Sequence, residues 1–367
     1  MKEQRLKSLD ALRGFDMLFI MGFSGLVASL CRLFPGTITD ELALQMQHVS
    51  WNGLSHHDTI FPLFLFLAGV SCPFSLSKQR AMGMSERDIY LKILRRMGML
   101  ILFGLIYNGL FDLNFEHLRW GSVLSRIGIA WAVAAILYVC CALRTRIVIS
   151  LVILIGYGLL SKFVAAPDVP NADPLTMEGC LAGYIDRLLM SGHLYLGHFD
   201  PEGLFSTIPA IVTAMMGIFT GELIRTPQEK ISGNQKTVYL LVTGIVLGLL
   251  AWIFNDALPI NKNLWSSTFV CAVGSYSLIM MALFYYIIDV RGWQQWTFVF
   301  RIIGMNSITI YMGQRIIDFN SISNFFFNGL GNLFPQAWSS SIHLAGYVFI
   351  SWLFLYFLYR QKIFLKI

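Results

Sequence analysis

Long apolar stretches alternate with short polar segments along the whole chain. A membrane-spanning helix needs about 20 consecutive, mostly apolar residues. Stretches of this kind number about ten, and they lie at 14–34, 59–77, 92–111, 122–143, 146–165, 205–224, 237–255, 264–289, 297–313 and 341–359. The pattern predicts an all-α fold, a polytopic integral membrane bundle of about ten transmembrane helices that forms a single domain over residues 1–367.

Composition agrees with a membrane protein and excludes several other classes. Of the 367 residues, 56% are hydrophobic and only 13% are charged, whereas a soluble domain carries about 25% charged residues. The net charge of +6 is explained by loop anchors, so we expect no nucleic-acid partner. Only Cys180 of the six cysteines lies in a long loop, and no CxxC motif occurs, so we expect neither a disulfide framework nor a zinc site. The N-terminus lacks the features of a cleaved signal peptide.

Lysine and arginine positions set the expected orientation, because they concentrate in cytoplasmic loops. With both termini in the cytoplasm, the loops 35–58, 166–204 and 314–340 lie on the outer side. Twenty basic residues then fall on or near the cytoplasmic side, namely Lys2, Arg5, Lys7, Arg13, Lys78, Arg80, Arg87, Lys92, Arg95, Arg96, Arg144, Arg146, Arg225, Lys230, Lys236, Arg291, Arg301, Arg360, Lys362 and Lys366.

The segment from His48 to Asp58 is the strongest candidate for chemistry. It places Trp51, Asn52 and three histidines at the outer mouth of two spans. A histidine can accept a proton near neutral pH, and a carboxylate can fix its tautomer. Two alternatives to a catalytic role remain. His48 could only cap a helix, or His56, His57 and Asp58 could bind a metal. The metal site is disfavoured because adjacent helical histidines point apart.

Further polar groups lie at both membrane faces. Asp200 and Glu202 on the outer side suit a sugar or amine ligand, as do Asn261, Asn263 and Trp265, although each group could instead cap a helix. On the inner side, Arg13, Lys92, Arg95 and Arg96 suit phosphates. Arg126, Asn306 and Asp16 are polar groups within spans and are expected to face the interior of the bundle.

The chain resembles the heparan-α-glucosaminide N-acetyltransferase family and its bacterial relatives, within the transmembrane acyltransferase superfamily. The matching strings run in order from end to end: RLKSLDALRG at 5–14, HVSWNGL at 48–54, DTIFP at 58–62, SRIG at 125–128, GYIDRLL at 183–189, DPEG at 200–203, INKNLWS at 260–266, GMNSI at 304–308 and RQKIFLKI at 360–367.

The resemblance implies transfer of acetyl from cytosolic acetyl-CoA, a co-substrate, to a glucosamine amine on the far side of the membrane. It places the catalytic histidine on His48 and a phosphate-contacting arginine on Arg96. Ser24 stands where the lysosomal enzyme has an asparagine near the acyl group. We expect no counterpart of the family's large lumenal domain and extra first span, and therefore a multi-pass protein of a bacterial inner membrane. The expected acceptor is the amine of glucosamine or a glucosaminide, a small amino sugar included.

The combined prediction is an acetyl-CoA-dependent N-acetyltransferase without a metal. His48 and Asp58 are the catalytic pair. Arg96, Arg95, Lys92, Arg13, Ser24 and Asn306 bind the donor, and Trp51, Asn52, Asp200, Glu202, Asn261, Asn263, Trp265 and Arg126 bind the acceptor. Two alternatives are O-acetylation of an envelope glycan and transport of small amino sugars. The partners expected are the amino sugar and membrane lipid, and the oligomeric state stays open, a homodimer included.

Overall fold

The computed structural model describes residues 6–190 and 194–365, and the regular secondary structure of these residues is helical. The only pairing of extended backbone there is one isolated antiparallel bridge between Ala165 and Cys180. The predicted class, a polytopic helical membrane protein, is confirmed. Lys2, Arg5 and Lys366, which were assigned to the cytoplasmic side, lie outside the described residues.

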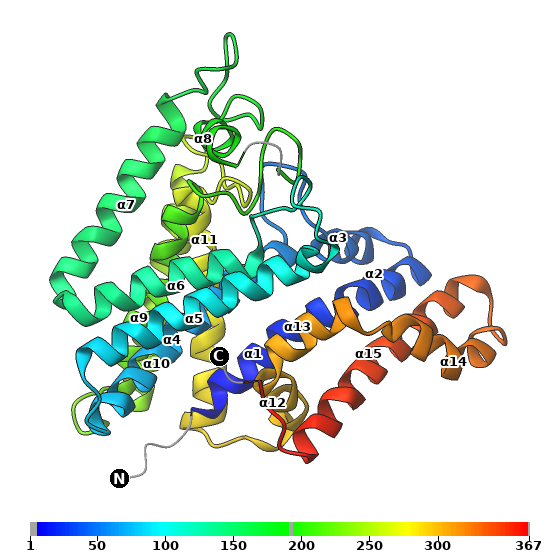
Figure 1. Cartoon of the computed structure of the whole chain (residues 1–367). Coiled ribbons are helices and arrows are strands. Elements are labelled where there is room, and N and C mark those ends of the chain that lie inside the picture. Colours follow the sequence, from blue (N-terminus) through cyan, green and yellow to red (C-terminus); the bar gives the residue numbers. More distant parts are fainter. Residues whose placement is uncertain (1–5, 191–193, 366–367) are drawn as a thin grey trace. The chain divides into compact units, whose positions relative to one another are not determined.

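Most helices follow one another closely in sequence, and longer loops flank α8 (Figure 1). The α-helices are α1 (Lys7–Leu18), α2 (Ser24–Leu33), α3 (Thr37–Gln45), α4 (His56–Ala81), α5 (Glu86–Tyr107), α6 (Val123–Cys140), α7 (Leu143–Phe163), α8 (Leu181–Leu189), α9 (Thr207–Arg225), α10 (Gly233–Phe254), α11 (Ser267–Phe284), α12 (Phe298–Met305), α13 (Ser307–Ile316), α14 (Phe319–Gly331) and α15 (Gln336–Arg360). Four short helical segments join them: η1 (Phe19–Phe23), η2 (Leu110–Asp112), η3 (Tyr285–Val290) and η4 (Gln295–Thr297).

Each of the ten predicted spans overlaps a helix, but only eight helical stretches of the described chain are long and apolar enough to cross a membrane. They are Lys7–Leu33, His56–Ala81, Val123–Cys140, Leu143–Phe163, Thr207–Arg225, Gly233–Phe254, Ser267–Val290 and Gln336–Arg360. The predicted span 92–111 corresponds to α5, whose apolar stretch carries Lys92, Arg95 and Arg96. The predicted span 297–313 is interrupted at Asn306, which separates α12 from α13.

The chain divides into two compact units. Unit 1 comprises residues 6–50, 55–60 and 283–365, and unit 2 comprises residues 51–54, 61–190 and 194–282. The prediction of one domain over the whole chain stays a prediction.

In unit 1, α1 packs closely against α12. A Cβ atom at Gly14 would lie 1.7 Å from the carbonyl oxygen of Phe300, and one at Gly304 would lie 2.0 Å from that of Asp10. Only glycine permits such an approach of two helix backbones. Gly22, at φ +103°, forms the bend in η1 that redirects the chain from α1 into α2. This bend leaves Ser24 at the start of α2, where the side chain is buried.

In unit 2, α6 packs against α5 and α9, and α9 also packs against α7. Ser122 caps α6 by accepting a hydrogen bond from the Ser125 amide at 3.0 Å. This cap fixes where α6 begins. Arg126 therefore enters the bundle one turn after the polar loop that precedes α6.

The segments predicted as outer loops hold short helices of their own. α3 lies within 35–58, α8 within 166–204 and α14 within 314–340. α3 has no buried residue, and Phe325 of α14 is among the most exposed aromatic side chains of unit 1. Phe325 and Phe326 pack edge to face, at 5.1 Å between ring centroids.

Candidate active site

His48 and Asp58 form a hydrogen-bonded pair in unit 1. His48 lies between α3 and α4, and Asp58 lies in the first turn of α4. The His48 Nδ1 is 2.7 Å from Asp58 Oδ1. The Asp58 side chain is 1% exposed, whereas 55% of the His48 side chain is exposed. A buried carboxylate thus orients an imidazole that reaches the surface of its unit.

Further donors hold the other oxygen of Asp58. Its Oδ2 accepts from Ser55 Oγ at 2.9 Å and from the backbone amides of Ser55 and Val49, both at 3.3 Å. Ser55 Oγ also approaches the carbonyl oxygen of Gln47, at 2.5 Å. A buried charge is tolerated when it is hydrogen-bonded in this way. The contacts tie the segment around His48 to the start of α4, so the pair is positioned by local structure.

The two neighbouring histidines diverge. The His57 ring packs against that of His48 at 4.4 Å between centroids, and its Nδ1 is 3.0 Å from Ser24 Oγ. The His56 ring packs instead on Phe19, at 4.5 Å. The described residues hold no group of three or more His, Cys, Asp or Glu side chains that could bind a metal ion. Ser24, predicted to bind the donor, therefore belongs to the same cluster as His48, and we call Ser24, His48, Ser55, His57 and Asp58 the His48 cluster.

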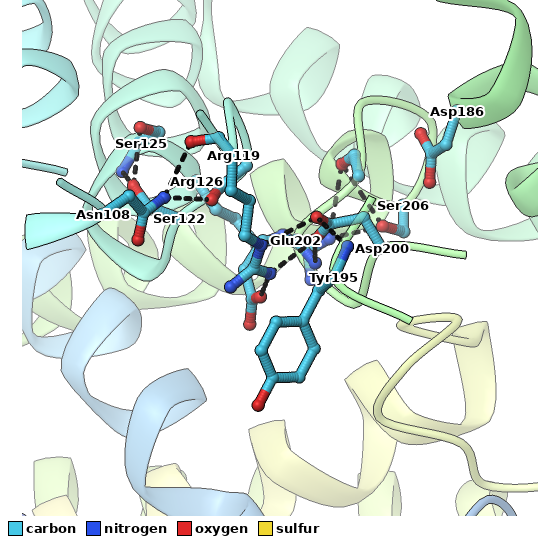
Figure 2. Close-up of polar contacts among 12 residues, drawn as sticks. Asn108, Arg119, Ser122, Ser125, Arg126, Asp186, Tyr195, Asp200, Glu202 and Ser206 are labelled. Atoms are coloured by element: carbon cyan, nitrogen blue, oxygen red, sulfur yellow. Dashed lines mark hydrogen bonds and ion pairs between the residues drawn. The ribbon is translucent and has the colours of Figure 1, made fainter. Parts of the chain in front are cut away.

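A second polar cluster lies in unit 2 and is centred on Arg119 (Figure 2). The Arg119 guanidinium donates through Nε to Asp200 Oδ2 at 2.8 Å, and it also pairs with Glu202. The Tyr195 ring packs on this guanidinium, 4.5 Å from Cζ to the centroid. Burial alone would lower the pKa of Arg119. The hydrogen bonds with Asp200 and the nearby charge of Glu202 outweigh burial and raise this pKa above its ordinary value. Asp200 and Glu202, predicted to bind the acceptor, are therefore held by an arginine.

Arg126 lies beside this ion pair and is almost fully buried. It donates to Ser206 Oγ and to the Gly203 carbonyl oxygen, and its guanidinium lies 5.0 Å from the centroid of Trp265. Among the described residues its Nε has no hydrogen-bond partner. Arg126 and Glu202 line one cavity of about 260 Å³. The other lining residues are Trp120, Gly121, Ser125, Ile129, Leu189, Met190, Leu204 and Thr207.

Asp186 of α8 is the third carboxylate of this region. It is fully buried, and its Oδ1 accepts from the Leu204 amide at 3.0 Å. Its Oδ2 has no partner in the part of the chain that the structure describes. Desolvation by burial raises the pKa of Asp186 to about 7. The carboxyl therefore changes charge near neutral pH. We call Arg119, Arg126, Asp186, Asp200 and Glu202 the Arg119 cluster.

Two more predicted acceptor residues meet across a long sequence separation. Asn261 Nδ2 donates to Asn52 Oδ1 at 3.0 Å, and the Gly53 amide donates to the Ile260 carbonyl oxygen at 2.8 Å. Asn261 Oδ1 also accepts from the Leu264 amide at 2.8 Å. This turn holds Trp265 at φ +51°, a conformation that is rare for a bulky residue.

The remaining predicted acceptor residues vary in exposure. Trp265 is completely buried and donates through Nε1 to Thr213 Oγ1 at 3.2 Å. Trp51 donates to the Leu175 carbonyl oxygen at 2.8 Å and is half-buried, and Asn263 is also half-buried.

The predicted donor-binding residues divide between the two units. Arg96 stacks on Trp131 in unit 2, 4.1 Å from Cζ to the ring centroid, whereas Lys92 and Arg95 are exposed on α5. Arg13 in α1 of unit 1 is half-buried. Asn306, also in unit 1, is 2% exposed, and neither its Oδ1 nor its Nδ2 has a partner among the described residues. A buried amide with no partner needs a ligand or water to satisfy it.

Sequence reasoning missed three members of these clusters. Arg119 and Asp186 were not predicted, although Arg119 is a basic residue in a predicted outer loop, where such residues are few. Ser55 was also missed, although it precedes Asp58 by three residues at the start of an apolar run, where a helix cap is expected.

Comparison with known proteins gives two kinds of match. The model of a family described as a domain of unknown function (DUF5009) matches residues 5–113. The human heparan-alpha-glucosaminide N-acetyltransferase is 29% identical in an alignment that covers 99% of this chain and 60% of the human protein. The mouse protein of the same name is 28% identical, over 88% of this chain and 56% of its own length. The chain thus spans little more than half the length of these relatives. Over nearly its whole length, the chain is therefore similar to heparan-alpha-glucosaminide N-acetyltransferase.

Proposed function

We propose that the protein is a membrane-bound acetyltransferase that moves acetyl from cytosolic acetyl-CoA to the amine of glucosamine or a glucosaminide on the periplasmic side of a bacterial inner membrane. The observation that carries this proposal is the 2.7 Å hydrogen bond between His48 and the buried Asp58. The relatives that the chain resembles are named as N-acetyltransferases, which supports the reaction class.

His48 acts as the general base. With Nδ1–H donating to Asp58, Nε2 is the basic nitrogen of the neutral ring. It takes a proton from the acceptor nitrogen while that nitrogen attacks the thioester carbonyl carbon. The carbon–sulfur bond breaks, and the CoA thiolate leaves and takes up the proton that the His48 imidazolium releases, which regenerates the base. Asp58 stabilises the imidazolium that forms, as in other carboxylate–histidine pairs. A general base placed in this way accelerates the reaction about 10²- to 10⁴-fold. The alternative route passes through a covalent acetyl-histidine intermediate.

The donor is held by cationic and amide groups. Arg96 is the main phosphate contact, and Lys92, Arg95 and Arg13 add positive charge on the cytoplasmic side. Asn306 fits a donor with amide and carbonyl groups, because both of its amide atoms lack partners among the described residues. Ser24 supports the catalytic histidine through its contact with His57.

The acceptor residues separate into ligand contacts and supporting groups. Arg126 and Glu202 line the 260 Å³ cavity, and Asn52 and Asn263 retain exposed surface, so these four contact the sugar. Asp200, Asn261 and Trp265 are completely buried and bonded to protein groups, so they position the contacts. Trp51 is half-buried and adds an aromatic face.

An activity assay with His48 variants tests the proposal. Purified protein in proteoliposomes is given radiolabelled acetyl-CoA with glucosamine, a glucosaminide or a glycan hydroxyl in parallel. His48→Ala should abolish transfer, and Asp58→Asn should lower it about 100-fold or more because the ring loses its orienting charge. The matched control is His117→Ala, an exposed histidine in a loop.

The outcomes distinguish the alternatives. Near-normal turnover in His48→Ala with intact thermal stability contradicts the proposed base. Transfer to glycan hydroxyls alone supports O-acetylation. Uptake of labelled glucosamine without acetyl-CoA supports a transporter.

A further inference from the structure

Unit 2 carries an apolar groove outside the clusters described above. Its cavity volume is about 400 Å³, within the range of about 300–1,000 Å³ that is usual for ligand sites. Residues of α7 and α10 form its walls, and Ser267, Thr268 and Cys271 of α11 form its floor. We call it the α7–α10 groove.

Packing on α11 holds the groove open. Ser267 Oγ donates to the Leu154 carbonyl oxygen at 2.6 Å, which fixes α7 on α11. A Cβ atom at Gly248 would lie 2.8 Å from Ser275 Oγ, so α10 also rests closely on α11. Both walls are therefore fixed to the same floor, and the groove is part of the packed structure of unit 2.

The walls present large apolar side chains that the protein itself does not cover. Ile155 is 61% exposed, Leu159 54% and Phe254 54%. Only 11% of the apolar window of α7 and 22% of that of α10 are buried inside the protein. Helices of this kind face lipid, and a concave lipid-facing surface takes a hydrocarbon chain.

Lys162 lines the same groove at the C-terminal end of α7. It is not among the twenty basic residues that the cytoplasmic side explains, and α7 leads into the 166–204 loop. Its ammonium lies 5.5 Å from the centroid of the Phe163 ring, so the charge stays at the end of the helix. A lysine at the edge of an apolar surface extends its charge toward the lipid headgroups.

We infer that the α7–α10 groove binds one phospholipid, with an acyl chain against α7, α10 and α11 and the anionic phosphate at Lys162. Charge complementarity selects this occupant, because an uncharged hydrocarbon would offer the Lys162 ammonium no negative charge at the groove's edge. The inference does not depend on the proposed enzymatic reaction. It assigns a specific lipid to a face that otherwise would meet only bulk bilayer.

A photo-crosslinking experiment tests the inference. The protein is delipidated in detergent, incubated with phosphatidylglycerol that bears a diazirine in one acyl chain, irradiated and mapped by peptide mass spectrometry. Adducts should concentrate on peptides that carry groove residues. Lys162→Gln should reduce them about fivefold, the loss expected when one lysine near an anionic headgroup is removed. Ala257→Trp, which places a large ring in the groove, should abolish them.

The control is Lys230→Gln, an exposed lysine in the loop before α10. It should leave the adducts unchanged. Adducts spread evenly over all lipid-facing helices, or adducts unchanged in Lys162→Gln, would overturn the inference. If Ala257→Trp lowers the thermal stability of the protein, the test of the inference rests on the adducts of Lys162→Gln alone.

Discussion

Removal of the Arg119 guanidinium should destabilise unit 2 strongly. Arg119 is the ion-pair partner of Asp200, which is 0% exposed, and of Glu202. In Arg119→Met the buried carboxylate loses its compensating charge, and losing one partner of a buried pair costs about 3–5 kcal/mol. Asp200 keeps the backbone donors Tyr195 at 3.2 Å and Glu202 at 2.8 Å, so the low end, about 3 kcal/mol, is expected. For a unit of this size the loss lowers the Tm by about 6–12 °C.

The assay is the thermal unfolding of purified protein in one detergent, followed by intrinsic fluorescence. The matched control is Arg80→Met, which breaks an exposed pair with Glu86 at 3.6 Å, where the side chains are 44% and 68% exposed. Such pairs contribute about 0–1 kcal/mol. The double variant Arg119→Met with Asp200→Asn should recover part of the lost stability, because the uncompensated charge is gone. A Tm for Arg119→Met equal to that of Arg80→Met would refute the reasoning.

Three further predictions follow from individual side chains. Arg96→Ala should weaken acetyl-CoA binding about ten- to hundredfold by calorimetry, because a charge-assisted phosphate contact of about 1.5–3 kcal/mol is lost; an unchanged dissociation constant would contradict the assignment. Burial raises the pKa of the Asp186 carboxyl from its ordinary value of 3.8 to about 7, so the folded state favours the protonated form. The contribution of this group to stability is therefore fully present below pH 3.8 and is lost as the pH rises through about 7. It amounts to at most about 4 kcal/mol, so Asp186→Asn should flatten the Tm–pH curve between pH 4 and 8, and a curve identical to that of the parent protein would exclude this role. With Cys140 replaced by Ser, a cysteine at Ala172 should react with an impermeant maleimide in intact cells and one at Glu229 only after lysis; the reverse result would invert the orientation.

Features that depend on neighbouring residues could be predicted from the sequence. The positions of the apolar helices follow from runs of residues that must avoid water, and each predicted span overlaps a helix. His48 and Asp58 are ten residues apart, and the intervening segment is short enough to bring them together. The interruption at Asn306 was missed, because one polar residue in an apolar run changes the hydrophobic pattern little, although it ends a helix.

Contacts between distant loops could not be predicted in this way. Arg119 and Asp200 are separated by 81 positions, and Asn52 and Asn261 by 209. Nothing in the local pattern says which carboxylate faces which arginine, because helix packing sets that partnership. The sequence therefore identified Asp200 and Glu202 as polar groups at a helix mouth, but it missed the guanidinium that holds them.

Basic residues that depart from the predicted cytoplasmic bias of lysine and arginine indicate partners that the local sequence pattern does not reveal. The predicted orientation places 20 of the 27 Lys and Arg residues on or near the cytoplasmic side and leaves seven unexplained. Among the seven, Arg119 pairs with two carboxylates, Arg187 pairs with Asp168 at 2.7 Å, and Lys162 borders the α7–α10 groove. A basic residue on the outer side lacks the topological reason that keeps its counterparts inside, so a specific partner is the expected reason for its presence. In a membrane protein of this kind, the few outer lysines and arginines are therefore the first side chains to examine for ion pairs and for sites that bind anionic ligands.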